Sequence, residues 1–302
     1  MFTVYLVRCA SYGVANFGLV EASTLVVTEE ISVIEVKRGR GRPRSETSLA
    51  NVSTVQALER GIFLLQALAQ NSAVSLSDLA VQVGMPASSA HRLLMTLQQH
   101  DFVDFDENTQ LWQVGIEAFR VGSAYLTRTN FLDAAREPLR NLMQATGETA
   151  NLAVMDKAEV VFVAQVETIN PVRAFFSAGT RALMHASGIG KALLAQMPKR
   201  KLELLLQSAG LPQYTPKTLS TPTELYADLK ATADRGWSYD QEERYEGMSC
   251  VGAAIRNAQG DLVGGISVSG PSVRFNPLQV AVIGFKVKAA ADQVTLTLGG
   301  KV

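Results

Sequence analysis

Two serines near the end of the chain have a spacing that suits ligand binding. They lie in the segment Ile266-Ser267-Val268-Ser269. In a β-strand, residues two apart point to the same side, so Ser267 and Ser269 share one face while Ile266 and Val268 take the other. Hydroxyl groups on the inner face of a sheet need hydrogen-bond partners, and a bound polar ligand can supply them. The pattern therefore indicates a site for a small polar molecule.

A second candidate is the segment from His185 to Ala192, which reads His-Ala-Ser-Gly-Ile-Gly-Lys-Ala. It is predicted to be a loop that enters a helix. Glycine lets backbone N–H groups approach a ligand closely, and the N-terminus of a helix favours an anion. The spacing is not that of a phosphate-binding loop, and an ordinary helix cap is the alternative interpretation.

Other polar residues of this region do not point to catalysis. Asp240-Gln241-Glu242-Glu243 is typical of a solvated surface, and Cys250 of a buried core thiol. Residues 149–302 contain no nucleophile–base pair, so we expect no catalytic residues and no enzyme. The two cysteines, Cys9 and Cys250, are far apart and fit neither a disulfide framework nor a metal site. This usage favours a reducing cytoplasm, without metal or cofactor.

A different chemistry is indicated near residue 90. A helix beginning at about Ala87 has an exposed first turn that carries Ser88, Ser89, His91 and Arg92. In a helix-turn-helix protein this end of the recognition helix enters the major groove of DNA. Serine hydroxyls donate or accept at base edges, and arginine binds guanine or phosphate. His91 is either a phosphate donor or a solvated surface residue.

The charge around this helix argues against strong DNA binding by this segment alone. Residues 51–115 contain Arg60 and Arg92 as their cations but six Asp and Glu residues. Phosphate neutralisation dominates affinity for DNA, so another segment must supply positive charge. Residues 37–44 carry five cations and no acid, among them Arg38, Arg40 and Arg42. This basic arm is suited to the phosphate backbone or the minor groove, and a solubilising linker is the alternative.

The elements that would position these residues can be read from periodicity. A helix from Thr54 has Leu58, Ile62, Leu65 and Leu68 at helical spacing, and Phe63 and Leu64 widen this apolar stripe. A short helix follows, capped by Ser75 or Ser77, then a break at 84–86, the helix of about 87–100, and a hairpin of 102–105 with 111–114. This order predicts a winged helix-turn-helix domain over 51–115 that binds double-stranded DNA. A winged helix used for protein contact is the alternative.

The rest of the chain is predicted to form linker helices over 116–146, with a break near 129–130 and a C-cap at Gly147, and a second domain over 147–302. The 302-residue length supports two domains. Expected strands cover 152–155, 160–164, 172–176, 249–257 and 262–269; expected helices cover 188–196, 200–208, 222–235 and 276–296. Hairpin-paired strands with grouped helices indicate an α+β sensor with a mainly antiparallel sheet. Residues 1–50 are expected to be a disordered extension. Its longest segment without a charged residue is too short to span a membrane.

Four motifs together resemble the IclR family of bacterial regulators. The resemblance runs from about residue 38 to 298 and is greatest to the branch with the glyoxylate-bypass and allantoin-utilisation repressors. It implies a winged-helix head, a GAF-like effector domain, dimers that often pair into tetramers on operator DNA, and no catalytic activity. The motifs are Gln56-Ala57-Leu58-Glu59-Arg60-Gly61, His185-Ala186-Ser187-Gly188-x-Gly190-Lys191-Ala192, Asp240-x-Glu242-Glu243 and Ile266-Ser267-Val268-Ser269-Gly270-Pro271.

In that branch the effector is a small 2-oxo acid, glyoxylate or pyruvate. The resemblance implies contacts with the backbone amides of Gly188 and Ile189 and with Asp240, Cys250, Ser267 and Ser269. An anion beside Asp240 is repelled unless that carboxyl accepts a hydrogen bond or is protonated.

The sequence departs from the branch at Ile189, where a small residue is usual, and at Ala174 and Ala182, where Met and Leu are usual. Ile189→Ala is therefore expected to enlarge the pocket. The prediction is a cytoplasmic, homodimeric or homotetrameric repressor. The alternatives are an activator that responds to an aromatic or sugar acid, and a small-acid-binding enzyme with a regulatory head.

Overall fold

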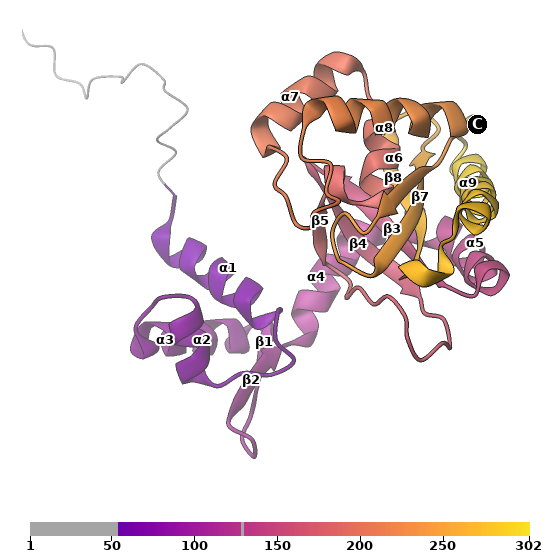
Figure 1. The fold of residues 1–302 in the computed structure, drawn as a ribbon. Helices are drawn as coiled ribbons and strands as arrows, with labels where there is room; N and C mark the ends of the chain where they lie inside the picture. Colours follow the sequence, from indigo (N-terminus) through magenta and orange to yellow (C-terminus); the bar gives the residue numbers. More distant parts are fainter. Residues whose placement is uncertain (1–53, 128–129) are drawn as a thin grey trace, which may run out of the picture. The chain divides into compact units, whose positions relative to one another are not determined.

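The computed structural model describes residues 54–127 and 130–302 of the chain (Figure 1). The predicted extension of residues 1–50 lies outside the described residues, and with it the basic arm and Arg38, Arg40 and Arg42. The described part begins with a small helical head, continues through helices α4 and α5, and ends in a larger domain built on a β-sheet (Figure 1).

The head has the predicted order of helix, helix, turn, helix and hairpin. Ser75 caps the second helix, where its side chain accepts a hydrogen bond from the backbone N–H of Asp78. The hairpin strands pair antiparallel, with Phe105 opposite Trp112. The winged helix-turn-helix prediction is confirmed. The elements are α1 (Gln56–Leu68), α2 (Leu76–Gln82), α3 (Ala87–Gln99), β1 (Val103–Asp106) and β2 (Leu111–Val114).

The core of the head uses part of the apolar stripe predicted on α1. Leu64 and Leu68 are fully buried, whereas Leu58 is 63% and Ile62 47% exposed. The buried face of α1 is centred on Leu64, Ala67 and Leu68. Leu58 and Ile62 line an open groove of about 710 Å³ between α1 and α3 instead.

Two helices connect the head to the sheet domain. They are α4 (Ile116–Thr127) and α5 (Phe131–Thr146). Of the predicted break at 129–130, residue 129 lies outside the described residues, and Asn130 adopts a left-handed conformation with φ 49° just before α5. Gly147 ends α5 with φ 70°, a left-handed conformation that glycine adopts without steric cost. The predicted C-cap is confirmed.

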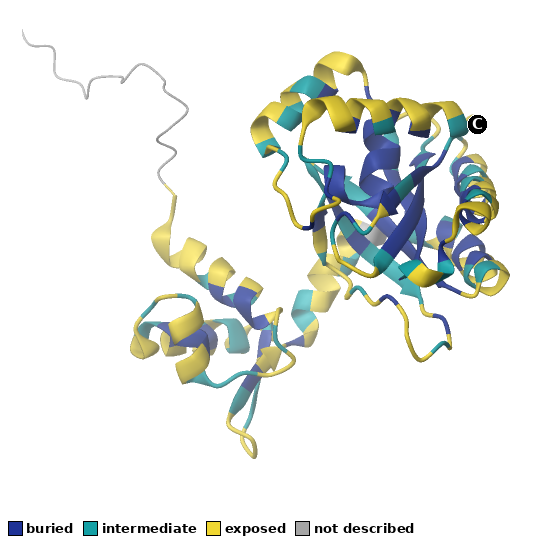
Figure 2. Ribbon diagram, in the orientation of Figure 1, coloured by how far each residue is buried: buried dark blue, intermediate teal, exposed yellow. Residues whose placement is uncertain are grey.

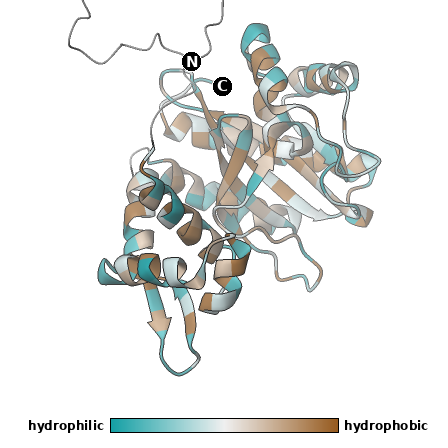
Figure 3. Ribbon diagram, turned by 90° about the vertical axis from the view of Figure 1, so that its left-hand side faces the viewer, coloured by the Kyte–Doolittle hydropathy of each residue, from teal (hydrophilic) through white to brown (hydrophobic). Residues whose placement is uncertain are grey.

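The second domain is built on a six-stranded antiparallel sheet with the order β5-β4-β3-β8-β7-β6. Hydrophobic residues recur along its strands (Figure 3). The strands are β3 (Thr149–Asp156), β4 (Glu159–Val166), β5 (Arg181–Leu183), β6 (Ser238–Gln241), β7 (Met248–Arg256) and β8 (Leu262–Pro271). The hairpins β3–β4 and β7–β8 and the α+β class agree with the sequence prediction.

One predicted strand is wrong and two short ones were missed. Residues 172–176 alternate in polarity but form no strand. The edge of β4 that they would need is taken, because Glu159–Val161 pair with β5 and Phe162 exchanges backbone hydrogen bonds with Gly179 and Thr180. β5 and β6 contain three and four residues, too few to give a periodic signal.

Helices cover the two faces of this sheet (Figures 1 and 3). On one face α5 and α9 pack over a core that includes Leu152, Val251 and Val268. On the other lie α6, α7 and α8, and all seven residues of α6 are buried (Figure 2). The helices that follow α5 are α6 (Gly188–Leu194), α7 (Lys199–Ala209), α8 (Pro222–Arg235) and α9 (Pro277–Thr297).

Among residues 54–127 and 130–302, none of the helices combines the length and the hydropathy of a membrane span.

Candidate functional site

The predicted DNA-contacting residues of the head lie at the start of α3. Ser88, His91 and Arg92 are exposed, and Ser89 is half-buried. Ser89 and Arg92 also lie on the rim of the groove between α1 and α3. Since the helix begins directly after Pro86, these side chains occupy its first two turns, the part that a recognition helix presents to base edges.

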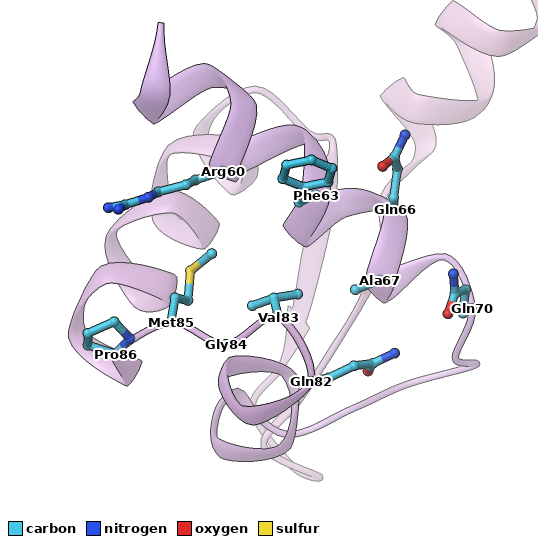
Figure 4. A pocket seen from close by; sticks show the side chains of 10 residues that line it. All are labelled: Arg60, Phe63, Gln66, Ala67, Gln70, Gln82, Val83, Gly84, Met85 and Pro86. Atoms are coloured by element: carbon cyan, nitrogen blue, oxygen red, sulfur yellow. The ribbon is translucent and has the colours of Figure 1, made fainter. Parts of the chain in front are cut away.

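An open depression of about 470 Å³ lies on another side of the head (Figure 4). Arg60, Phe63 and Gln66 project from α1, and Met85 projects from the turn before α3 (Figure 4). Phe63 is 56% exposed. None of the buried polar atoms that lack a partner in the described residues lies here. The depression therefore lacks the buried polar groups expected of a small-molecule site.

The sheet domain carries two rows of polar side chains that cross its strands. In the first row the strand register places Ser269 opposite both Thr149 and Cys250, and Cys250 opposite Asp240. In the second, Ser267 lies opposite Asn151. These residues are all buried and lie on the face covered by α6, whereas the alternating apolar residues face α5 and α9. The predicted shared face of Ser267 and Ser269 is therefore observed.

The first turn of α6 rests directly on these rows. A Cβ atom at Gly252 would lie 2.6 Å from the backbone nitrogen of Ile189, so this close approach requires glycine in β7. The hydroxyl of Ser238 donates to the carbonyl of Gly188 over 2.5 Å. The side chain of Ile189 is fully buried in the core against Gly265. It is not part of the cavity lining, so a ligand contact at Ile189 rests on its backbone N–H.

A narrow cavity, partly open to solvent, lies between α6, the sheet and the segment that follows β6. It leaves about 20 Å³ in which the centre of a water molecule fits, room for about one water. Phe162 and Phe176 close one side with rings stacked 4.6 Å apart. Ala182 lines the cavity and Ala174 does not. A ligand larger than one water molecule would fit here only if these walls separated. The candidate residues among the lining are Gly188, Asp240, Cys250 and Ser269.

The acidic stretch after β6 is not the solvated surface that the sequence predicts. Asp240 and Glu243 are 5% and 4% exposed. The physical reason is Lys191, a fully buried lysine on α6. Its Nζ lies 2.5 Å from Glu243 Oε1 and 3.1 Å from Asp228 Oδ2, and donates to the carbonyl of Tyr239 over 2.6 Å. Carboxylates tolerate burial when a cation and hydrogen bonds compensate them.

This cluster contains more acidic groups than cations. Burial raises the pKa of Asp240 to about 6, although the charge of Lys191 opposes the rise. Burial also raises the pKa of Glu243. Three carboxyl groups thus share one ammonium, and the cluster tends to keep a proton as the pH falls below neutral. Since Asp240 lines the cavity, it can donate a hydrogen bond there when protonated.

Cys250 agrees with the prediction of a buried thiol and also lines the cavity. Burial raises its pKa to about 11, so the sulfur is a neutral thiol at neutral pH and a poor nucleophile. Among residues 54–127 and 130–302, no group of three or more His, Cys, Asp or Glu side chains is arranged to hold a metal ion.

Asn151 is a site residue that the sequence analysis missed. It is fully buried, and its Nδ2 donates to Ser269 Oγ over 3.2 Å, with the carbonyl of Thr149 at 3.5 Å. Because Ser269 Oγ accepts this bond, its own proton is free to point elsewhere. Asn151 Oδ1 and Ser267 Oγ have no hydrogen-bond partner among the described residues. The signal was present in the sequence, since Thr149 and Asn151 repeat the two-residue spacing of the serines.

Two family profiles match the chain. Residues 57–107 match the profile described as IclR helix-turn-helix domain. Residues 123–296 match the profile described as Bacterial transcriptional regulator IclR C-terminal. The first range contains α3, and the second contains the buried polar rows.

Individual proteins are similar over most of their length. The chain is 41% identical over 273 residues to "Transcriptional repressor IclR" of Escherichia coli, covering 89% of this chain and 99% of that protein. It is 40% identical over 261 residues to "HTH-type transcriptional regulator BhcR" of Paracoccus denitrificans, covering 85% and 94%. The crystal structure of Thermotoga maritima IclR superposes with a TM-score of 0.69 at 28% identity, covering 81% and 99%.

Proposed function

We propose that this chain, which belongs to the IclR family of bacterial transcriptional regulators, is a repressor whose binding to operator DNA is controlled by a small organic acid. The observation that carries the proposal is the buried row of Ser269, Cys250 and Asp240, which faces a narrow cavity beneath α6. The Escherichia coli relative is named a repressor, which supports the same sign of regulation here.

The head supplies DNA recognition in this proposal. Ser88, Ser89, His91 and Arg92 of α3 contact base edges or phosphates in the major groove. Residues 51–115 have only two cations against six acids, so affinity for DNA depends on charge from elsewhere. The basic arm of residues 37–44 is the segment that supplies it, through Arg38, Arg40 and Arg42.

The effector in this proposal is a small 2-oxo acid such as glyoxylate or pyruvate. Ser269 Oγ already accepts a bond from Asn151, so its hydroxyl proton can be donated to a carboxylate. Ser267 Oγ has no partner among the described residues, and the amides of Gly188 and Ile189 lie over the same part of the sheet.

We further propose that the protein acts as a homodimer or homotetramer. Helix α4 presents Ile116 and Phe119, both 70% exposed, and α9 presents Leu278 and Phe285, 83% and 66% exposed. Exposed apolar side chains grouped on helices mark surfaces that associate. A twofold arrangement would also double the number of basic arms on the DNA.

The test is calorimetric titration of the full chain with glyoxylate, pyruvate and longer 2-oxo acids. Ser269→Ala removes the donor and should weaken binding about tenfold or more, since a hydrogen bond to a charged group contributes about 1.5–3 kcal/mol. Ser208→Ala, on α7, is the matched control and should bind like the wild type. If the unaltered protein binds none of these acids, the effector belongs to another class.

A further inference from the structure

Two arginines line the effector cavity, and they differ in their partners. Arg181, on β5, is held in ion pairs with Asp156 and with Glu159, the latter with Nε 2.6 Å from Oε2. Arg244 forms no ion pair with any carboxylate in the described part of the chain, although Glu242, Glu243 and Asp240 lie within four residues of it. The cavity therefore contains one arginine held in two ion pairs and one that forms none, although the charge of Arg244 lowers the pKa of Asp240 nearby.

Aromatic rings, rather than carboxylates, hold Arg244 in place. Its guanidinium carbon lies 4.1 Å from the centroid of the Tyr214 ring and 5.6 Å from that of Tyr245. The Tyr214 ring also stacks with the ring of His185, their centroids 6.0 Å apart. The side chains of Tyr214 and Tyr245 also take hydrogen bonds from the guanidinium, which leave its positive charge without a carboxylate partner and do not use all five of its N–H donors. Arg244 is half-buried, so water only partly screens it.

A third cation near the cavity, Lys191, is already paired. Lys191 is bound to Glu243, Asp228 and the carbonyl of Tyr239, and it lies behind the cavity wall rather than in it. Asp240 adds negative charge to that wall. An anion that enters this space needs a cation that is still free to bind it. Of the charged residues that line the cavity, Arg244 meets this requirement.

We propose that Arg244 binds the carboxylate of the effector and makes the site selective for an acid over its neutral amide. The inference deepens the proposed function and rests on it. A planar guanidinium offers two parallel N–H donors to one carboxylate, while the hydroxyl of Ser269 donates to the same group from the sheet. The bound acid thereby joins the segment 241–247, which carries Arg244, to strand β8. A neutral amide gains little from the guanidinium.

The experiment compares acids with their amides. Calorimetry of the full chain is performed with glyoxylate and pyruvate, each beside its amide, on the wild type, Arg244→Gln and Arg181→Gln. Arg244→Gln should weaken acid binding at least about tenfold and leave amide binding nearly unchanged, so the preference for the acid falls by the same factor. Arg181→Gln, at the paired arginine, should change acid and amide binding alike and keep the preference.

Arg244→Lys and thermal denaturation separate binding from folding. The lysine keeps the charge but loses the two-donor geometry, so it should restore part of the preference for the acid. An acid-over-amide preference in Arg244→Gln equal to that of the wild type would overturn the inference. If Ser269→Ala loses affinity in that case, the proposed function stands without Arg244. If the wild type binds neither acid, both the inference about Arg244 and the proposed 2-oxo acid effector fail.

Discussion

The head and the sheet domain organise their functional residues in opposite ways. On the head, Ser88, His91 and Arg92 are exposed side chains on a helix whose other face forms the core. In the sheet domain, Asp240 and Lys191 are buried and bonded to the structure around them. Exposed side chains such as those of α3 can change with little effect on folding. The buried polar residues of the candidate site are also part of the fold, so substitutions there are expected to affect both binding and stability.

The largest effect is expected from Lys191→Met in the sheet domain. The substitution leaves Glu243 and Asp240 buried without their cation, which should destabilise the domain by about 3–5 kcal/mol. Lys199→Met is the matched control, because Lys199 is 86% exposed and its Nζ lies 3.9 Å from Glu203. We expect that control to change stability by less than about 0.5 kcal/mol. Chemical denaturation measures the free energy of unfolding of both variants. If Lys191→Met is as stable as Lys199→Met, the buried cluster does not hold the domain together.

On the DNA-binding side, the largest effect is expected from the basic arm. Replacing the five cations of residues 37–44 by Gln keeps the length of the chain and removes its main positive segment. Operator and non-specific binding should weaken together, and the salt dependence should become shallower by about 0.9 in log–log slope for each phosphate that the arm no longer neutralises. Fluorescence anisotropy at several salt concentrations measures this. An unchanged slope would remove the arm from the mechanism.

A smaller and more selective effect is expected within α3. Arg92→Ala should reduce discrimination between operator and random DNA by about 1–3 kcal/mol, the contribution of a base-edge contact. Stability should change little, since Arg92 is exposed. Gln99→Ala, exposed at the far end of the same helix, is the control. If the ratio of operator to random affinity survives in Arg92→Ala, this arginine does not read bases.

The last effect expected is a pH dependence of effector binding. An anion near Asp240 favours its protonated form, so binding takes up a proton once the pH exceeds the pKa of about 6. Affinity should be constant below that pH and fall by up to about tenfold per unit above it. Asp240→Asn still offers an oxygen to the backbone N–H of Glu243 and should remove the dependence. A flat wild-type profile from pH 5.5 to 7.5 would show that Asp240 binds the effector while ionised.

Periodicity was sufficient to predict the long elements of both domains. The wing hairpin, the cap at Ser75 and the strand pair β7–β8 follow from local signals that the fold respects. Helix α1 is a case in which periodicity alone does not determine the buried face. Its apolar residues extend around more than one face, so the sequence could not decide whether Leu58 or Leu64 faces the core.

The candidate effector site was predicted in part, for a reason visible in Asp240 and Asn151. Ser267 and Ser269 were found because polar residues stood alone in an apolar strand. Asp240 and Glu243 were predicted to be solvated because nothing in the sequence links them to Lys191, which lies about 50 residues earlier. That pairing exists only once α6 packs against β6. The identity of the chain as a regulator rather than an enzyme is confirmed by its family.

The most direct test of the account is whether the effector acts on DNA binding through the buried row. DNA fragments flanking the gene that encodes this chain are titrated with protein, with and without glyoxylate or pyruvate, for the wild type and Ser269→Ala. We predict that the acid shifts the DNA affinity of the wild type and that Ser269→Ala needs about tenfold more acid for the same shift, with unchanged DNA affinity in its absence. DNA binding by the wild type that no small organic acid alters would contradict the account.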